Sequence, residues 1–135
     1  MNAFCAEVLV AAVILSAVAA AKDDEVLVPD SFLKTDFAPA QRYLAIKVRG
    51  DFHDYPIPDA LGYMVRKCKD LDGGGYKIRF DWIGPRPSEP LPLFTRKFKD
   101  VPLRTFFYML SQDSGWIMEW RYEKKRPRTI TFRKP

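Results

Sequence analysis

The sequence predicts an α+β domain made of two strand-helix-strand units and a C-terminal hairpin strand. Three observations lead to this prediction. Apolar residues alternate with polar ones in several short runs, as they do in half-buried strands. Two stretches between these runs carry apolar residues at i, i+3, i+4 and i+7, the spacing of one helical face. The whole order of patterns then occurs twice. Because two amphipathic helices need an apolar surface to cover, we expect both helices on one face of a small mixed or antiparallel sheet.

The first 21 residues have the composition of a signal peptide. Residues 8–21 are apolar or small apart from Ser16, and the small residues 17–21 suit a signal peptidase. We therefore expect cleavage near Ala21, no transmembrane span after cleavage, and a periplasmic or secreted protein. An uncleaved anchor is the alternative, because residues 1–7 carry no Lys or Arg. The apolar run is shorter than the roughly 20 residues that a spanning helix needs.

The remaining chain is basic, with 22 basic against 16 acidic residues once Glu7 is removed with the signal segment. This excess favours acidic partners such as an anionic glycan, lipid headgroups or an acidic protein surface. Solubility alone is the alternative explanation. Cys68 is the only cysteine after the signal segment, so no intramolecular disulfide is expected. Its helical spacing predicts a buried and inert thiol.

An N-terminal arm, residues 22–40, precedes a single α+β domain at residues 41–135. Short apolar groups in the arm are broken by Pro29 and Asp30, so we expect the arm to pack only in part. The first strand-helix-strand unit spans about residues 43–83. Its first strand alternates from Tyr43 onward and is predicted to end at Gly50.

A helix follows, with Pro56 and Pro58 in its first turn, where a proline sacrifices no intrahelical hydrogen bond. Its apolar face is formed by Leu61, Met64, Val65 and Cys68. The sequence Asp-Gly-Gly-Gly at 72–75 predicts the end of this helix. One face of the next strand is formed by Tyr76, Ile78, Phe80 and Trp82.

The second unit, about residues 93–133, follows an extended connector that contains Pro85, Pro87, Pro90 and Pro92. A strand is predicted from Phe94 to Phe98, and Pro102 begins a helix that Gly115 ends. The apolar face of that helix is formed by Leu103, Phe106, Phe107 and Leu110, and one face of the next strand by Trp116, Met118, Trp120 and Tyr122. A hairpin loop from Glu123 to Pro127 leads to a last strand with Ile130 and Phe132 on one face.

The two units align with each other. Moving the second back by 46 residues places Phe98 on Phe52 and Pro102 on Pro56, and a shift of 40 places the strands after the helices together. We interpret this as an internal repeat. The alternative is that any two short amphipathic units would align in this way.

The residues of the second unit resemble a known family. The stretch Phe98-x-x-Val101-Pro102-Leu103, followed by Phe107, Leu110, Ser114-Gly115 and Thr129-Ile130-Thr131-Phe132, is similar to the secretin and TonB N-terminus short domain and to related periplasmic modules. Tyr55-Pro56-Ile57 repeats the turn before the first helix. The resemblance covers roughly residues 43–132. It implies a small βαββαβ-like module that serves protein–protein contact and has no catalytic residues.

The densest basic cluster is formed by Lys124, Lys125, Arg126 and Arg128 in the predicted hairpin. Basic residues near aromatic ones can bind nucleic acid, but export argues against that partner. An acidic glycan, lipid or protein is the candidate target. A solvated hairpin tip without a ligand is the alternative.

His53 is the only histidine and lies close to Asp51 and next to Asp54, so it is the one candidate for a metal or acid–base site. A solvated turn is the alternative, and a small hydrolase built on His53 ranks last among the hypotheses. We expect no cofactor and no enzymatic activity. The first hypothesis is an exported docking or signalling module of the cell envelope that binds another envelope protein through a sheet edge or a helix face. The second is an anionic glycan- or lipid-binding module that uses the basic hairpin.

Overall fold

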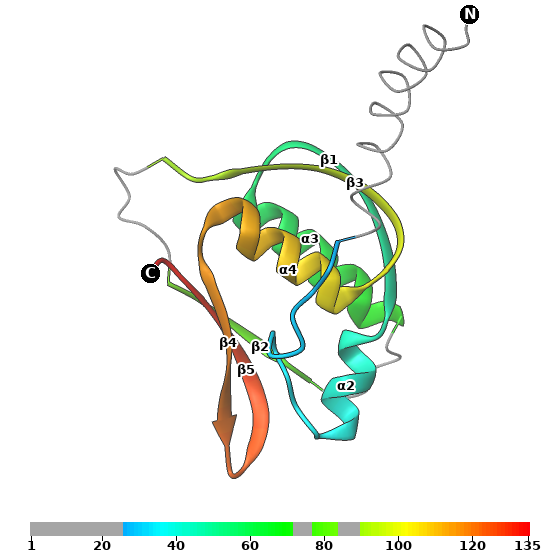
Figure 1. The fold of residues 1–135 in the computed structure, drawn as a ribbon, viewed down its shortest axis with the longest axis vertical. Helices are drawn as coiled ribbons and strands as arrows, with labels where there is room; N and C mark the ends of the chain where they lie inside the picture. The colour runs from blue at the N-terminus through cyan, green and yellow to red at the C-terminus, as the bar shows by residue number, and fades with distance from the viewer. Residues whose placement is uncertain (1–25, 72–76, 84–89) are drawn as a thin grey trace, which may run out of the picture.

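The computed structural model describes residues 26–71, 77–83 and 90–135. The signal segment, residues 22–25 of the arm, the glycine-rich helix end at 72–75, Tyr76 and residues 84–89 of the connector lie outside the described residues. In chain order the elements are α2 (Ala38–Leu44), β1 (Lys47–Pro56), α3 (Ile57–Leu71), β2 (Arg79–Ile83), β3 (Leu93–Pro102), α4 (Leu103–Ser114), β4 (Ile117–Glu123) and β5 (Arg126–Arg133) (Figure 1).

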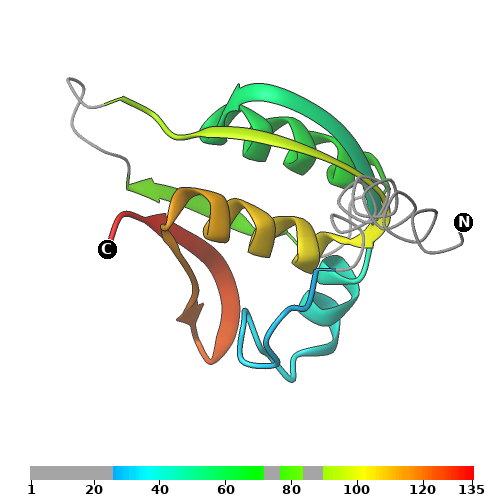
Figure 2. The same cartoon turned by 45° about the horizontal axis from the view of Figure 1, so that its top comes forward.

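The fold is α+β, with two strand-helix-strand units and a final hairpin strand, as the sequence predicts. The strands form two sheets. In the first, β1 and β3 are antiparallel, and in the second β5 lies between β2, which is parallel to it, and β4, which is antiparallel. Helices α3 and α4 lie between the two sheets (Figure 2).

Helix α4 shows why the helices have a sheet on each side. Its neighbouring residues Phe106 and Phe107 are both fully buried. The Phe106 ring lies 5.8 Å from that of Phe94 in the first sheet, whereas the Phe107 ring lies 5.6 Å from that of Phe80 in the second. A helix that is apolar on so much of its circumference cannot be covered by one sheet alone.

An approximate twofold axis relates the first two elements of each unit. A shift of 46 residues converts the bounds of β1 into those of β3, and the first residue of α3 into that of α4. The same shift exchanges the partners of every pair in the β1–β3 ladder, so Asp51 and Lys97, which face each other, mark the axis. The amide of Ile57 donates to the Pro92 carbonyl (3.0 Å), and the amide of Leu103 donates to the equivalent Ile46 carbonyl (2.8 Å).

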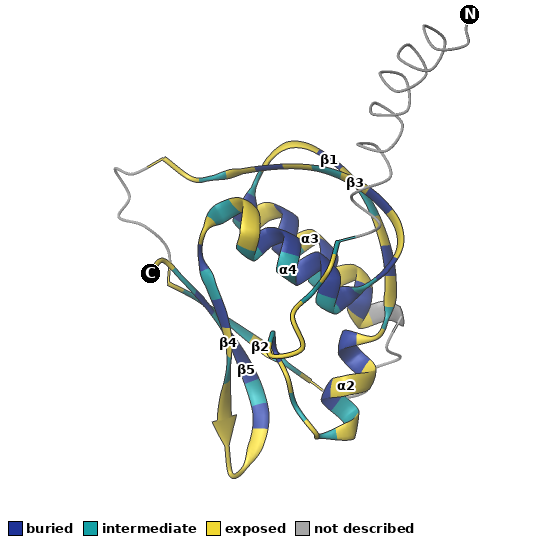
Figure 3. Cartoon of the chain, in the orientation of Figure 1, coloured by how far each residue is buried: buried dark blue, intermediate teal, exposed yellow. Residues whose placement is uncertain are grey.

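The rings of Phe52 and Phe98, which this axis exchanges, stack with their centroids 6.2 Å apart. Phe106 lies 5.9 Å from the first and 5.6 Å from the second. All three are buried, and the core around them is mostly aliphatic and aromatic. Figure 3 shows buried positions along both α3 and α4. The centre of the domain is therefore an aromatic cluster shared by both units.

Two predicted boundaries of the first strand are wrong. Tyr43 and Leu44 belong to α2, where they share a buried face with Ala40 at i+3 and i+4 spacing, and the strand begins only at Lys47. The strand also does not end at Gly50 but continues to Pro56. A Cβ atom at residue 50 would lie 2.5 Å from the Phe52 ring and 2.9 Å from the Phe98 ring, so this glycine allows the two rings to pack.

The N-terminal arm takes part in the core. Leu33 is buried, and its carbonyl accepts a hydrogen bond from the Trp120 indole nitrogen at 2.8 Å. Arg104 of α4 donates to the carbonyls of Pro29 and Phe32. Because these contacts all reach α4 and β4, the arm covers the second unit, and α2 begins within it.

Candidate docking surfaces

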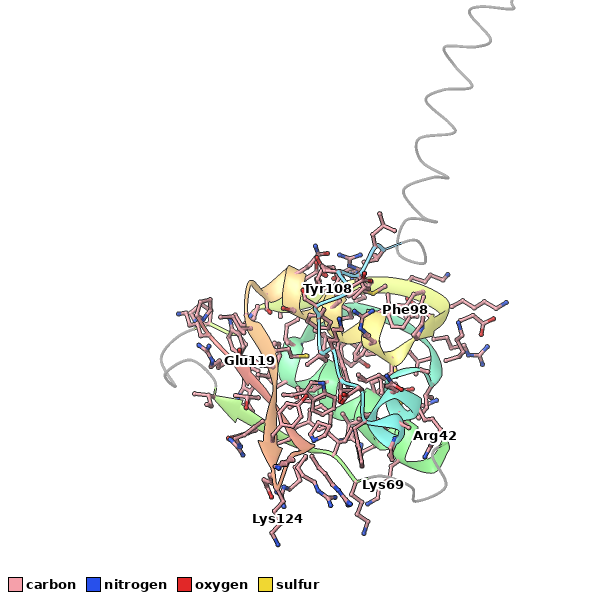
Figure 4. The ribbon with its side chains drawn as sticks, turned by 60° about the horizontal axis from the view of Figure 1, so that its bottom comes forward. Arg42, Lys69, Phe98, Tyr108, Glu119 and Lys124 are labelled. Carbon is pink, nitrogen blue, oxygen red and sulfur yellow. The ribbon has the colours of Figure 1, made fainter. Side chains whose placement is uncertain are left out.

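The basic hairpin is tighter than the sequence suggests. β4 ends at Glu123 and β5 begins at Arg126, so Lys124 and Lys125 alone make the turn. Both have positive φ angles, 50° and 65°, which define the type I′ turn that matches strand twist. Figure 4 shows Lys124 projecting from the tip of the hairpin. Such turns favour Asn-Gly, and two lysines hold the left-handed conformation at a cost in stability.

A groove beside the turn end of this hairpin gathers further cations. Its lining comprises Lys77, Arg79, Glu123, Lys124, Arg126 and Arg128. Arg79 forms an ion pair with Glu123, and the Arg126 guanidinium lies 5.5 Å from the centre of the Phe37 ring. The structure thus brings Lys77 and Arg79 beside the predicted cluster. Sequence reasoning missed them, because only the parallel pairing of β2 with β5 places them there.

The outer face of the second sheet is balanced in charge. Arg121 pairs with Asp81 across the central strand (2.8 Å), and Arg133 pairs with Glu119 (3.1 Å). These are exposed pairs and contribute little to stability. Thr129 lies between Arg79 and Arg121 in the strand register and is buried. Because the charges on this face are paired with one another, it offers a weaker attraction for an anion than the hairpin tip.

A second groove lies beside helix α3 and is called here the α3 groove. It is lined by Arg49, Gly50, Asp51, Phe52, Tyr55, Tyr63, Lys67, Lys97, Phe98 and Lys99. Phe52 and Phe98 are buried and form its floor, whereas the residues Tyr55 and Tyr63 remain 42% and 38% exposed. The Phe52 ring contacts the Tyr55 ring edge to face, with 5.1 Å between centroids. Four basic residues and one acidic residue line this aromatic hollow.

Sequence reasoning missed the α3 groove. Arg49 of β1 and Lys67 of α3 are 18 positions apart in the sequence, and no sequence pattern indicates that they line the same groove. The available signal was the exposed Tyr63, which interrupts the polar face of α3. Lys67 lies over its ring, with Nζ 5.4 Å from the ring centre.

His53 lies on the exposed surface of β1, beside Asp54. The His53 Nε2 atom lies 3.6 Å from an Asp54 carboxylate oxygen, and both side chains are largely exposed to solvent. Asp54 instead contacts Thr95, whose hydroxyl lies 3.1 Å from Asp54 Oδ1. Within residues 26–71, 77–83 and 90–135, no group of three or more His, Cys, Asp or Glu residues is placed to hold a metal ion. Cys68 is buried, as its helical spacing predicts.

The strands of the first sheet have irregular edges. The β1–β3 register shifts at two places, between Val48 and Gly50 and between Phe52 and Tyr55. Asp54 and its twofold equivalent Asp100 have φ angles of 53° and 57°. Bulges and charged residues are the features with which proteins prevent another strand from adding to an edge.

No protein-family model matches the chain, and no curated protein matches it. Among the described residues, no helix combines the length and the apolar character needed to cross a membrane.

Proposed function

We propose that this chain is an exported, non-enzymatic docking module of the cell envelope, and that the α3 groove receives its partner protein. The observation that carries this proposal is the pair of exposed tyrosines, Tyr55 and Tyr63, over the buried Phe52 floor. The signal-like residues 1–21 support export, and the resemblance to the secretin and TonB N-terminus short domain agrees with a contact role.

The composition of the groove supports a protein partner. Tyrosine and arginine are enriched at the centres of protein interfaces, because they combine a large apolar area with hydrogen-bonding groups. The α3 groove offers Tyr55, Tyr63 and Arg49 around an aromatic floor. The bulged edges of β1 and β3 disfavour strand addition there, so a helix-face contact is the better supported mode.

Affinity capture from envelope extract tests this function. The tagged protein is compared with a Tyr55→Ser/Tyr63→Ser variant, and with Tyr122→Ser as the matched control. Tyr122 is 51% exposed on β4, outside the α3 groove. We expect the double variant to lose the captured partner and the control to keep it. Equal retention by both variants would remove the α3 groove as the docking site.

The second candidate function is binding of an anionic glycan or lipid by the basic hairpin. It is favoured by the left-handed conformation of Lys124 and Lys125, which keeps two cations at a turn where Asn-Gly would be less strained. Vesicles of anionic and of zwitterionic lipid, and an acidic polysaccharide, serve as probes. Binding should fall steeply as salt rises, because exposed charges are screened. Unchanged binding by Lys124→Ser/Lys125→Ser/Arg126→Ser would exclude this role.

A further inference from the structure

We infer that the α3 groove binds a carboxylate side chain of an acidic peptide segment, in the place that an internal arginine–aspartate pair fills in the second unit. The inference rests on the proposed docking function and adds the chemistry of the partner. It follows from comparing the two positions that the twofold axis relates.

In the second unit an ion pair closes this position. Arg96 of β3 donates from Nε and Nη2 to both carboxylate oxygens of Asp113 at the end of α4, each at 2.9 Å. The two side chains are only 18% and 26% exposed. A planar guanidinium bound by both oxygens of a carboxylate is a directional and well-held arrangement. The Arg96 side chain thus covers the space between strand and helix.

In the first unit both members of the pair are replaced. The shift of 46 residues places Gly50 at the position of Arg96, and Lys67 at that of Asp113. Gly50 has no side chain that could reach the helix, since the rings of Phe52 and Phe98 fill the place of a Cβ atom there, and Lys67 carries the opposite charge to Asp113. An ion pair like Arg96–Asp113 therefore cannot form here. The α3 groove lies over the two rings instead, and the charge on the helix beside it is positive.

The neighbouring charges have the same sign as Lys67. Arg49, Lys97 and Lys99 line the groove with it, and Asp51 is the single acidic residue in the lining. An acidic group is the complementary occupant, because it replaces the missing anion of the pair beside the positive charges of Lys67 and Arg49. Lys67 already lies over the Tyr63 ring, so a carboxylate that meets its Nζ atom lies beside the tyrosine pair.

The floor favours a peptide over a purely hydrated anion. The space next to the Gly50 Cα atom is occupied by the rings of Phe52 and Phe98, so the bottom of the groove is aromatic. An apolar side chain next to the carboxylate can bury its surface on these rings and on Tyr63. A peptide in which Asp or Glu is adjacent to Leu or Phe can therefore pair its carboxylate with the basic residues of the rim and bury its apolar side chain on the aromatic floor.

Two short peptides test the inference with the whole exported protein. The first is acetyl-Leu-Glu-Phe-Glu-Leu-amide, and the second has glutamine in place of each glutamate. Binding is followed by NMR from the amide signal of Gly50 and the ring signals of Tyr63. We expect the acidic peptide to bind at least about tenfold more tightly at low salt, as a charge-assisted hydrogen bond provides.

Charge reversal on α3 supplies the matched variants. Lys67→Glu should abolish the preference for the acidic peptide and favour a peptide with lysine in place of glutamate. Lys69→Glu is the control, since Lys69 is exposed on the same helix but does not line the α3 groove. Both substitutions replace an exposed lysine of α3 by glutamate and change the net charge equally. A difference between their effects on peptide binding must therefore come from the position of Lys67 in the α3 groove.

Several results would overturn the inference. They are equal affinity for the acidic and glutamine peptides, no binding of either at millimolar concentration, equal effects of Lys67→Glu and Lys69→Glu, or the same spectral shifts with inorganic phosphate alone. The last result would indicate a general anion site. If the glutamine peptide binds as tightly as the acidic one and Tyr55→Ser/Tyr63→Ser abolishes that binding, docking stands and carboxylate recognition fails. If that double variant still captures the partner, the docking function itself fails.

Discussion

The two units have nearly the same strand-helix geometry, yet one is closed and the other is open. Helix α4 is buried among both sheets and the arm, and the pair Arg96–Asp113 covers its end. Helix α3 keeps an exposed side that carries Tyr63 and Lys67 and borders a groove. The backbone pattern is common to both, so the difference lies in a few side chains. We conclude that two copies of one unit can have different roles: the helix of one copy is buried in the core, and the helix of the other borders an exposed groove.

The largest expected effect concerns the ring at the centre of the twofold arrangement. Phe106 occupies the position that Ala60 occupies in α3, and both are fully buried. Phe106→Ala should destabilise the protein by about 3–5 kcal/mol, because the rings of Phe52 and Phe98 lose their common neighbour and a cavity remains. Urea unfolding followed by tryptophan fluorescence measures the change in the free energy of unfolding.

The reverse substitution sharpens this result. Ala60→Phe adds a ring where the core is already filled, and we expect a loss of roughly 1–3 kcal/mol from overpacking. If Ala60→Phe proved neutral, or Phe106→Ala cost less than about 1 kcal/mol, the core would not depend on a large side chain at residue 106 and a small one at residue 60.

The second prediction concerns the arm, which is hydrogen-bonded to α4 and β4 of the second unit. Leu33→Ala should cost about 2–3 kcal/mol, because Leu33 is buried against the core and its removal leaves a cavity. Hydrogen exchange should show the loss most strongly in α4 and β4. Leu27→Ala in the same arm is the control, because Leu27 is 89% exposed and its truncation should change stability by less than about 0.5 kcal/mol. Equal effects of the two substitutions would contradict the role given to the arm.

The third prediction tests the closing ion pair. Arg96→Ala should destabilise the protein by about 1–3 kcal/mol, because Asp113 loses two charge-assisted hydrogen bonds in a partly buried setting. Lys67→Ala, at the position equivalent to Asp113, should stay within about 0.5 kcal/mol of the parent. A double-mutant cycle of Arg96→Ala with Asp113→Ala measures the coupling, and additive effects of the two changes would show that the pair contributes nothing.

The sequence predicts the units but not their asymmetry. The i, i+3, i+4 spacing finds both helices, and the 46-residue shift finds the equivalence of Phe52 with Phe98, since these depend on local patterns. The sequence pattern does not reveal that β1 pairs only with β3 and that β2, β4 and β5 form a separate sheet. Strand pairing is decided by contacts between residues that are distant in sequence. The start of the first strand is misplaced for a similar reason. Tyr43 and Leu44 fit a strand pattern, but Ala40 and the preceding proline place them on a helix.

The two candidate surfaces also differ in how far the sequence predicts them. Charge density finds Lys124 and Lys125, which are consecutive in sequence. The α3 groove depends on Gly50 and Lys67, which become informative only when they are compared with Arg96 and Asp113 across the twofold axis. A small residue and a reversed charge at equivalent positions are visible in the aligned units, so the repeat contained this signal once the helix register was fixed.

The smallest effect distinguishes the two strand irregularities that precede the helices, at Asp54 in β1 and at Asp100 in β3. Asp54 and Asp100 are equivalent and both left-handed, a conformation that glycine adopts without strain. Asp100→Gly should stabilise the protein by about 0.5 kcal/mol, a gain limited by the greater freedom of glycine in the unfolded chain. Asp54→Gly should give no gain or a small loss, because it also removes the carboxylate that accepts a hydrogen bond from the Thr95 hydroxyl. The residue equivalent to Thr95 is Arg49, so Asp100 has no corresponding threonine opposite it.

Urea midpoints of the two variants, with Thr95→Val to remove the hydroxyl, measure the difference. If both glycine variants shifted stability equally in the parent protein, the two strand irregularities would be equivalent in energy as well as in backbone, and the asymmetry of the units would begin only at the helices.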